Sequence, residues 1–100
     1  MPKLAFLARF EAKPGKEAEV AAFLQTARDM AAKEPTTIDW YAIRLSPSTF
    51  GVFDTFNDEA GRQKHLNGPI GQALMAKASE LFSSAPSIVP VDLLGSKHQA

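Results

Sequence analysis

The sequence of 100 residues contains no cysteine. This absence excludes disulfide bonds, thiolate metal sites and a cysteine nucleophile. It also fits a reducing compartment, and we expect a cytoplasmic protein. Histidine is scarce, with two residues, and no HxxxH or HExxH motif or cluster of acids is present. Because a tight metal site needs several such ligands at short spacing, we expect no metal.

The chain also lacks an excess of charge, since 11 lysines and arginines balance 11 aspartates and glutamates. Domains that bind nucleic acids usually carry a basic stripe, so we expect no nucleic-acid partner. The sequence has no GxGxxG or P-loop motif and no GxSxG motif. We therefore expect no nucleotide cofactor and no serine hydrolase. An enzyme with this sequence must work with few catalytic groups and no cofactor.

Long hydrophobic runs are absent as well. The first apolar run begins at Leu4 and is interrupted by Arg9 and Glu11. A secretory signal needs about 7–15 apolar residues and a membrane span about 20, so we expect no membrane partner. Hydrophobic residues still make up 45% of the chain, which is enough for one domain with its own core. We expect this domain to cover residues 1–95 and residues 96–100 to form a flexible tail.

The apolar residues that are present follow strand and helix patterns in the order β-α-β-β-α-β. This order predicts a ferredoxin-like α+β fold, a four-stranded antiparallel sheet with helices on one face only. The other face then needs a cover, and we expect a second copy of the chain, in a homodimer. Pro90 cannot donate a ladder hydrogen bond, so the last strand should lie at an edge. The strand-like runs are residues 4–10, 38–45, 50–56 and 88–94, and the helical runs are 16–33 and two segments split at Gly68-Pro69.

The two middle strand-like runs flank Ser46-Pro47-Ser48 and predict a hairpin. If Ser46 faces Thr49, Tyr41 pairs with Asp54. A loop one residue longer changes every such partnership, because neighbouring residues of a strand point to opposite faces.

Two side chains are candidates for acid–base chemistry. His65 lies near the end of a predicted helix, where it acts as a general base or hydrogen-bond donor, or else caps the helix near Gly68. Asp54 lies in the middle of an apolar strand, where an acid needs a partner or water. It orients or deprotonates a substrate hydroxyl, or else pairs with Arg44 or Arg9 across the dimer interface.

The first hairpin strand carries a second set of candidates. Trp40 and Arg44 share one face of this strand and Tyr41 lies on the other. An aromatic side chain beside an arginine can bind a flat phenolic ligand. Packing in the core or at a dimer interface is the alternative.

Over about residues 4–95 the chain resembles the antibiotic biosynthesis monooxygenase (ABM) domain family of dimeric α+β barrels. The resemblance rests on the order and spacing of four segments, Lys13–Glu17, Glu34-Pro35, Phe50–Phe56 and Asn57–Leu66. One departure is Phe56, where the family often has a tryptophan. Another is the lack of an asparagine in the first strand, which disfavours haem degradation.

The resemblance implies a homodimer with a pocket between each sheet and its helices. Some members of the family oxygenate phenols, quinols or anthrones with O2 and without a cofactor. The expected function is therefore cofactor-independent monooxygenation of a small aromatic molecule, in which His65 or Asp54 takes the phenol proton. A non-catalytic module that binds an aromatic metabolite, and a non-oxidative isomerase or cyclase, remain open. The side chains expected to bind the ring are Trp40, Tyr41, Arg44 and Phe56.

Overall fold

The computed structural model describes residues 2–97 and confirms the predicted order of strands and helices. The first helix ends two residues earlier than expected, because the chain turns at residues 32–33. Of the expected tail, residues 98–100 lie outside the described part of the chain. The elements are β1 (Leu4–Glu11), α1 (Glu17–Ala31), β2 (Asp39–Arg44), β3 (Thr49–Phe56), α2 (Glu59–Leu66), α3 (Pro69–Leu81) and β4 (Ser87–Asp92).

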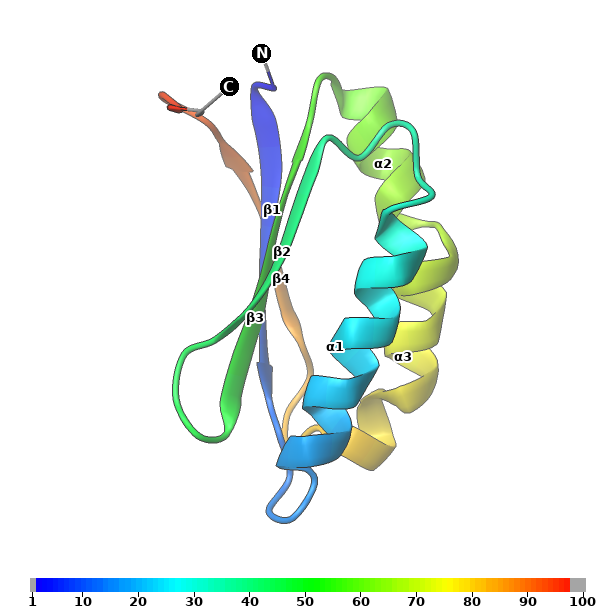
Figure 1. Ribbon diagram of the computed structural model, residues 1–100, viewed down its shortest axis with the longest axis vertical. Coiled ribbons are helices and arrows are strands. Elements are labelled where there is room, and N and C mark those ends of the chain that lie inside the picture. Colours follow the sequence, from blue (N-terminus) through cyan, green and yellow to red (C-terminus); the bar gives the residue numbers. More distant parts are fainter. Residues whose placement is uncertain (1, 98–100) are drawn as a thin grey trace.

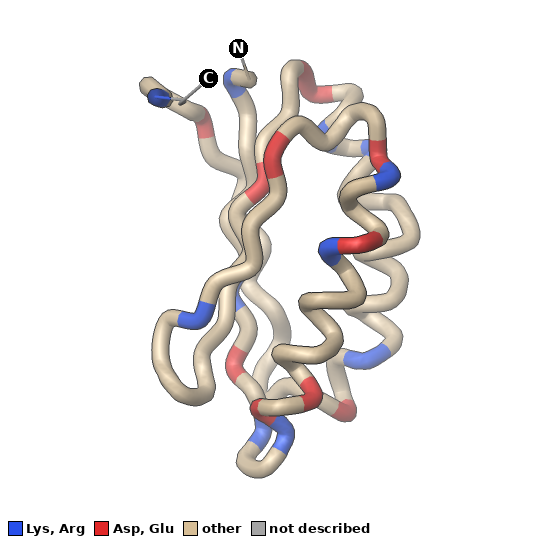
Figure 2. The backbone as a smooth tube through the Cα atoms, in the orientation of Figure 1, with Lys and Arg blue, Asp and Glu red and all other residues tan. Residues whose placement is uncertain are grey.

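The four strands form one antiparallel sheet in the order β2-β3-β1-β4, which is the predicted ferredoxin-like architecture. Helices α1, α2 and α3 cover one face of this sheet, and within residues 2–97 no helix lies on the other face (Figure 1). β4 is an edge strand, as Pro90 predicted. Positive and negative residues are interspersed over the helices and loops (Figure 2). None of the helices in residues 2–97 is both long and apolar enough for a membrane span.

The hairpin register differs by one residue from the expected one. The backbone N–H of Leu45 donates to the carbonyl of Thr49 at 2.8 Å, so the loop contains three residues, 46–48. As a result Asp54 pairs with Trp40, and not with Tyr41. Residues directly opposite in a sheet share a face, so this register places Asp54 and Trp40 side by side on the helix-covered face.

The core lies between the sheet and the helices. Phe6, Ala8 and Phe10 of β1 are buried there, whereas Leu7 is 39% exposed on the other face. The apolar first strand therefore hides only one face fully in the single chain. The helices contribute residues at the spacing of one helical face, and those of α1 are Val20, Leu24, Ala27 and Ala31.

The uncovered face of the sheet carries a row of apolar side chains that crosses all four strands. Strand pairing places Tyr41, Phe53, Leu7 and Val89 in one line. Tyr41 is 53% exposed and Val89 46% exposed. A contiguous exposed apolar patch of this kind is typical of an interaction surface.

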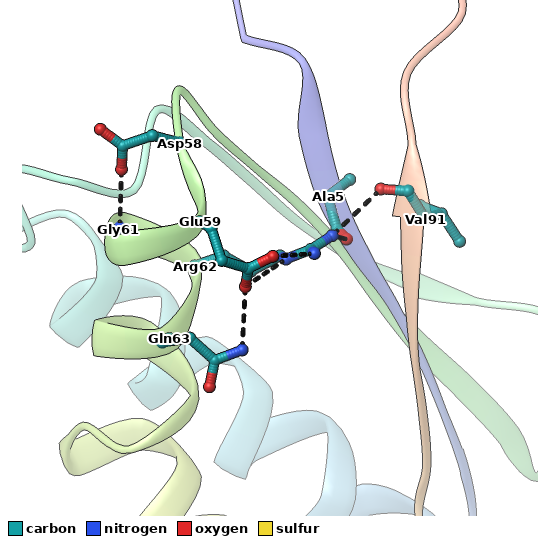
Figure 3. A network of polar contacts seen from close by, with 7 residues as sticks. All are labelled: Ala5, Asp58, Glu59, Gly61, Arg62, Gln63 and Val91. Atoms are coloured by element: carbon teal, nitrogen blue, oxygen red, sulfur yellow. Dashed lines mark hydrogen bonds and ion pairs between the residues drawn. The ribbon is translucent and has the colours of Figure 1, made fainter.

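Arg62 connects α2 to the sheet (Figure 3). Its guanidinium pairs with Glu59 and donates to the backbone oxygens of Ala5 on β1 and Val91 on β4, at 3.3 and 3.4 Å. It also lies 5.5 Å from the centroid of the Phe6 ring. These contacts fix α2, and with it the side chains that α2 presents, against the edge of the sheet.

The ends of α2 and α3 follow local sequence signals. Asp58 caps α2, with its Oδ1 accepting from the Gly61 N–H at 2.8 Å. Pro69 occupies the first turn of α3, where its missing N–H costs nothing. Gly71 allows α3 to approach α2 closely, since a Cβ at this position would lie 2.5 Å from the Leu66 carbonyl oxygen.

Candidate functional site

A small, mainly apolar cavity lies between the sheet and the helices. Its volume is about 50 Å³, enough for a few water molecules. Phenylalanines 6, 10 and 23 line it together with aliphatic side chains of α1, α3 and β4. The polar residues in its lining are Trp40, Asp54 and His65.

Asp54 is the buried acid of the cavity. Only 3% of its side chain is exposed, and its Oδ2 lies 2.9 Å from Nε2 of His65. Its Oδ1 is buried and has no hydrogen-bond partner in the described part of the chain. Within the single chain, Asp54 therefore pairs with His65.

His65, in the last turn of α2, lies between two carboxylates. Its Nδ1 is 2.6 Å from Oε1 of Glu34, and 9% of its side chain is exposed. Carboxylates only accept hydrogen bonds, so donation from both ring nitrogens fits the imidazolium form. Burial is the largest single influence on the His65 pKa and lowers it. The hydrogen bonds and charges of Asp54 and Glu34 together outweigh burial and raise the pKa above its ordinary value.

Glu34 reaches His65 from the loop between α1 and β2. The Thr37 hydroxyl donates to Glu34 Oε1 at 2.7 Å and lies 3.3 Å from His65 Nδ1. In the sequence, Glu34 stood out only as part of the Glu34-Pro35 segment of the family resemblance. Because α1 already ends at Ala31, Glu34 belongs to the loop and turns toward α2. The periodicity of the sequence does not predict the contact between Glu34 and His65.

Trp40 supplies a second unpartnered polar atom. Its Nε1 and Asp54 Oδ1 are the two buried side-chain atoms within residues 2–97 that have no hydrogen-bond partner. A buried indole N–H usually finds an acceptor, and a buried carboxylate oxygen a donor. Both residues line the inner cavity.

The other three candidate binding residues lie away from the cavity lining. Tyr41 is on the uncovered face of the sheet. Arg44 lies over the ring of Phe50, 4.7 Å from its centroid, in a groove between α1 and β2. Phe56 is fully buried, with its ring 5.2 Å from that of His65, but it does not line the cavity.

The groove between α1 and β2 is the larger space, at about 840 Å³. Leu24 and Trp40 line both this groove and the inner cavity, so they form the wall between the two. Across residues 2–97, no three histidine, aspartate or glutamate side chains are grouped so as to hold a metal ion. The site thus offers acid–base and hydrogen-bonding groups at the edge of an apolar cavity.

Comparison with known proteins supports the fold. No protein-family model matches the sequence, and no curated protein matches it either. The chain is 56% identical to the NE2512 protein of unknown function from Nitrosomonas europaea, with a TM-score of 0.96, covering 100% of this chain and 97% of that one.

Two solved structures share the fold at low identity. SnoaB, a cofactor-independent oxygenase from Streptomyces nogalater, matches with a TM-score of 0.79 and 13% identity, over 96% of this chain and 97% of its own. A candidate antibiotic biosynthesis monooxygenase from Caulobacter crescentus matches with a TM-score of 0.78 and 20% identity, over 94% and 92%. The resemblance to ABM domains is thereby confirmed at the level of the fold.

Proposed function

Since the chain belongs to the same family as the Nitrosomonas europaea protein and has the ABM fold, we propose that it is a cofactor-independent monooxygenase that oxidises a phenolic, quinol- or anthrone-type aromatic with O2. The observation that carries this proposal is the carboxylate of Asp54. It is buried at an apolar cavity, and His65 balances its negative charge. Its Oδ1 has no hydrogen-bond partner among the described residues.

In the proposed reaction Asp54 Oδ1 accepts the proton of a phenol or of the enol form of an anthrone. The resulting anion is electron-rich and gives an electron to O2, after which the two radicals combine into a peroxide on a ring carbon. Asp54 returns its proton to the peroxide, and loss of water leaves the quinone. One oxygen atom enters the product, and the other leaves as water with the two hydrogens that the substrate loses. The substrate supplies all four electrons that reduce O2, two for each oxygen atom.

Trp40 has a complementary role in this proposal. Its buried N–H is a donor for the oxygen on which negative charge develops, which favours the anion over the neutral substrate. The same side chain separates the cavity from the outer groove. The cavity of about 50 Å³ is smaller than a typical ligand site of about 300–1,000 Å³. In this proposal the aromatic ring therefore enters from the groove, and Trp40 and Leu24 move apart to admit it.

The partner proposed for the uncovered sheet face is a second copy of the chain. The row formed by Tyr41, Phe53, Leu7 and Val89 is apolar on all four strands. Tyr41, Leu7 and Val89 are exposed and Phe53 is half-buried, and no helix within residues 2–97 covers them (Figure 1). Tyr41 would then pack at the interface, while the aromatic substrate occupies the helix-covered side.

Oxygen uptake with a panel of anthrones and hydroquinones tests the proposed function. We expect uptake above the uncatalysed rate, falling by about 10²–10⁴-fold in Asp54→Asn, which keeps the shape but lacks the basic carboxylate. Glu80→Gln, which changes an exposed carboxylate of α3, is the matched control and should leave the rate unchanged.

The other outcomes decide between the alternatives. Product formation under nitrogen would indicate an isomerase or cyclase. Binding of the panel compounds without conversion would indicate a binding module. Uptake that is equal in wild type and Asp54→Asn would contradict the assigned role of Asp54.

A further inference from the structure

His65 separates two spaces. On its inner side is the cavity that contains Asp54, and on its outer side is a surface pocket of about 400 Å³ that contains Glu34. Among the residues that the structure describes, His65 is the one that lines both. The side chain of Glu34 is 19% exposed, so the outer carboxylate reaches solvent while the inner one does not.

This arrangement answers an electrostatic problem at Asp54. A carboxylate with 3% exposure is strongly disfavoured unless a cation balances it, and a neutral acid cannot act as a base. His65 is the balancing group, but burial also disfavours the imidazolium. A neutral imidazole has a single N–H and can donate to only one of its two carboxylate neighbours.

Glu34 supplies a second negative charge beside the His65–Asp54 pair. Its Oε1 lies 2.6 Å from His65 Nδ1, and the Thr37 hydroxyl holds the same oxygen at 2.7 Å. A negative charge at each nitrogen favours the imidazolium form of His65. Removing the outer charge would weaken that preference.

We propose that Glu34 is a positioning residue of the site: acting through His65, it keeps the Asp54 carboxylate ionised and fixes Oδ2, so that Oδ1 is left for the ligand. The inference rests on the proposed role of Asp54 as the base. Glu34 itself does not touch the substrate.

The surroundings of the His65 ring agree with this role. Its charged neighbours are Asp54 from β3 and Glu34 from the loop before β2. Lys33 and Lys64 line the outer pocket and are exposed, so water and salt screen their charges. The ring of Phe56 packs 5.2 Å away and adds no charge.

The direct test is the protonation state of His65, read from its ring nitrogens by ¹⁵N NMR between pH 5 and pH 10 (approximate limits set around the ordinary histidine pKa). The chain has two histidines, and His98→Gln assigns the signals. We expect both nitrogens of His65 to be protonated at neutral pH in the wild type. In Glu34→Gln the titration midpoint should fall by about one pH unit or more.

Three further variants make this test decisive. Glu80→Gln, the matched change on α3, should titrate like the wild type, and Glu34→Asp should recover part of the shift. Thr37→Val should give an intermediate midpoint, because it keeps the Glu34 charge and removes the hydroxyl that holds the Glu34 carboxylate. This variant also provides the test if Glu34→Gln does not fold. An unchanged midpoint in Glu34→Gln, or a neutral His65 in the wild type at neutral pH, would overturn the proposal.

Kinetics separate this inference from the proposed function. If the panel yields a substrate, Glu34→Gln should lower kcat more than it raises KM, and its rate should recover as the pH increases and the shared proton leaves. A pH–rate profile with the same acid limb as the wild type would contradict the positioning role. The NMR experiment needs no substrate, so it can fail or succeed independently of the monooxygenase proposal.

Discussion

At the scale of single residues, the position of Asp54 depends on the length of one loop. With three residues between β2 and β3, Asp54 lies opposite Trp40 and faces the helices. With a two-residue loop, its cross-strand partner would be Tyr41. The candidate site therefore depends on the hairpin register. Pro47 and its neighbouring serines are compatible with a loop of either length, so they do not determine this register.

The Asp54–His65–Glu34 arrangement makes stability depend on pH. Because the His65 pKa is higher in the folded chain than in the unfolded one, the folded chain binds the extra proton. This stabilisation is complete below the unfolded pKa and is lost as the pH rises through the folded one. We expect urea denaturation to show a falling free energy of unfolding over that interval. His65→Gln should have a flatter profile, and a wild-type stability that rises there would contradict the assignment.

Residue type alone indicated part of the site. An acid in an apolar strand, the one histidine before the tail and the single tryptophan were recognisable as candidates, and the structure brings Asp54, His65 and Trp40 together. Glu34 was not recognisable, because its contact with His65 joins a loop to a helix 31 positions away. Local sequence patterns describe what lies within a turn or two of a residue, and this contact lies beyond that range.

At the scale of elements, the order of strands and helices followed from periodicity, while the close approach of α3 to α2 did not. Proline and glycine at the junction predicted a break between two helices, which the structure confirms. They did not show that Gly71 packs against the carbonyl of Leu66, next to His65. This packing sets where the last turn of α2 lies relative to the cavity.

Gly71→Ala tests the packing of α3 on α2. The new Cβ would lie 2.5 Å from the Leu66 oxygen, a backbone atom that can move only with its helix. We expect a loss of about 1–3 kcal/mol in the free energy of unfolding, although alanine is the better helix former. Gly95→Ala is the control, since a Cβ there would meet nothing within 4 Å. Equal or higher stability of Gly71→Ala in urea denaturation would contradict the close approach.

At the scale of the whole molecule, one covered and one uncovered sheet face define what the chain can bind. The helices lie on one face of the sheet (Figure 1). The cavity is on that face, and the other face presents apolar side chains to solvent in the single chain. Sequence periodicity predicted this two-layer arrangement, because the helices have one apolar stripe each. The partner of the uncovered face stays a prediction.

Light scattering tests the proposed homodimer. We expect a mass of twice 10.8 kDa for the wild type. Leu7→Lys places a charge in the middle of the apolar row and should shift the mass toward that of one chain. Met75→Lys, on α3 and 62% exposed, is the control and should leave the dimer intact. A wild-type mass of one chain over a wide concentration range would contradict the dimer.

The central claim is that Asp54 and Trp40 form one site for a hydroxylated aromatic. Trp40 is the only tryptophan, so its indole N–H gives a single, assignable NMR signal. We would titrate the protein with a dihydroxyanthraquinone, a product-like probe that carries both a phenolic O–H and a quinone oxygen. We expect a saturating downfield shift of the Trp40 signal and an affinity about tenfold or more weaker in Asp54→Asn. An unmoved Trp40 signal, or an affinity that Asp54→Asn leaves unchanged, would contradict it.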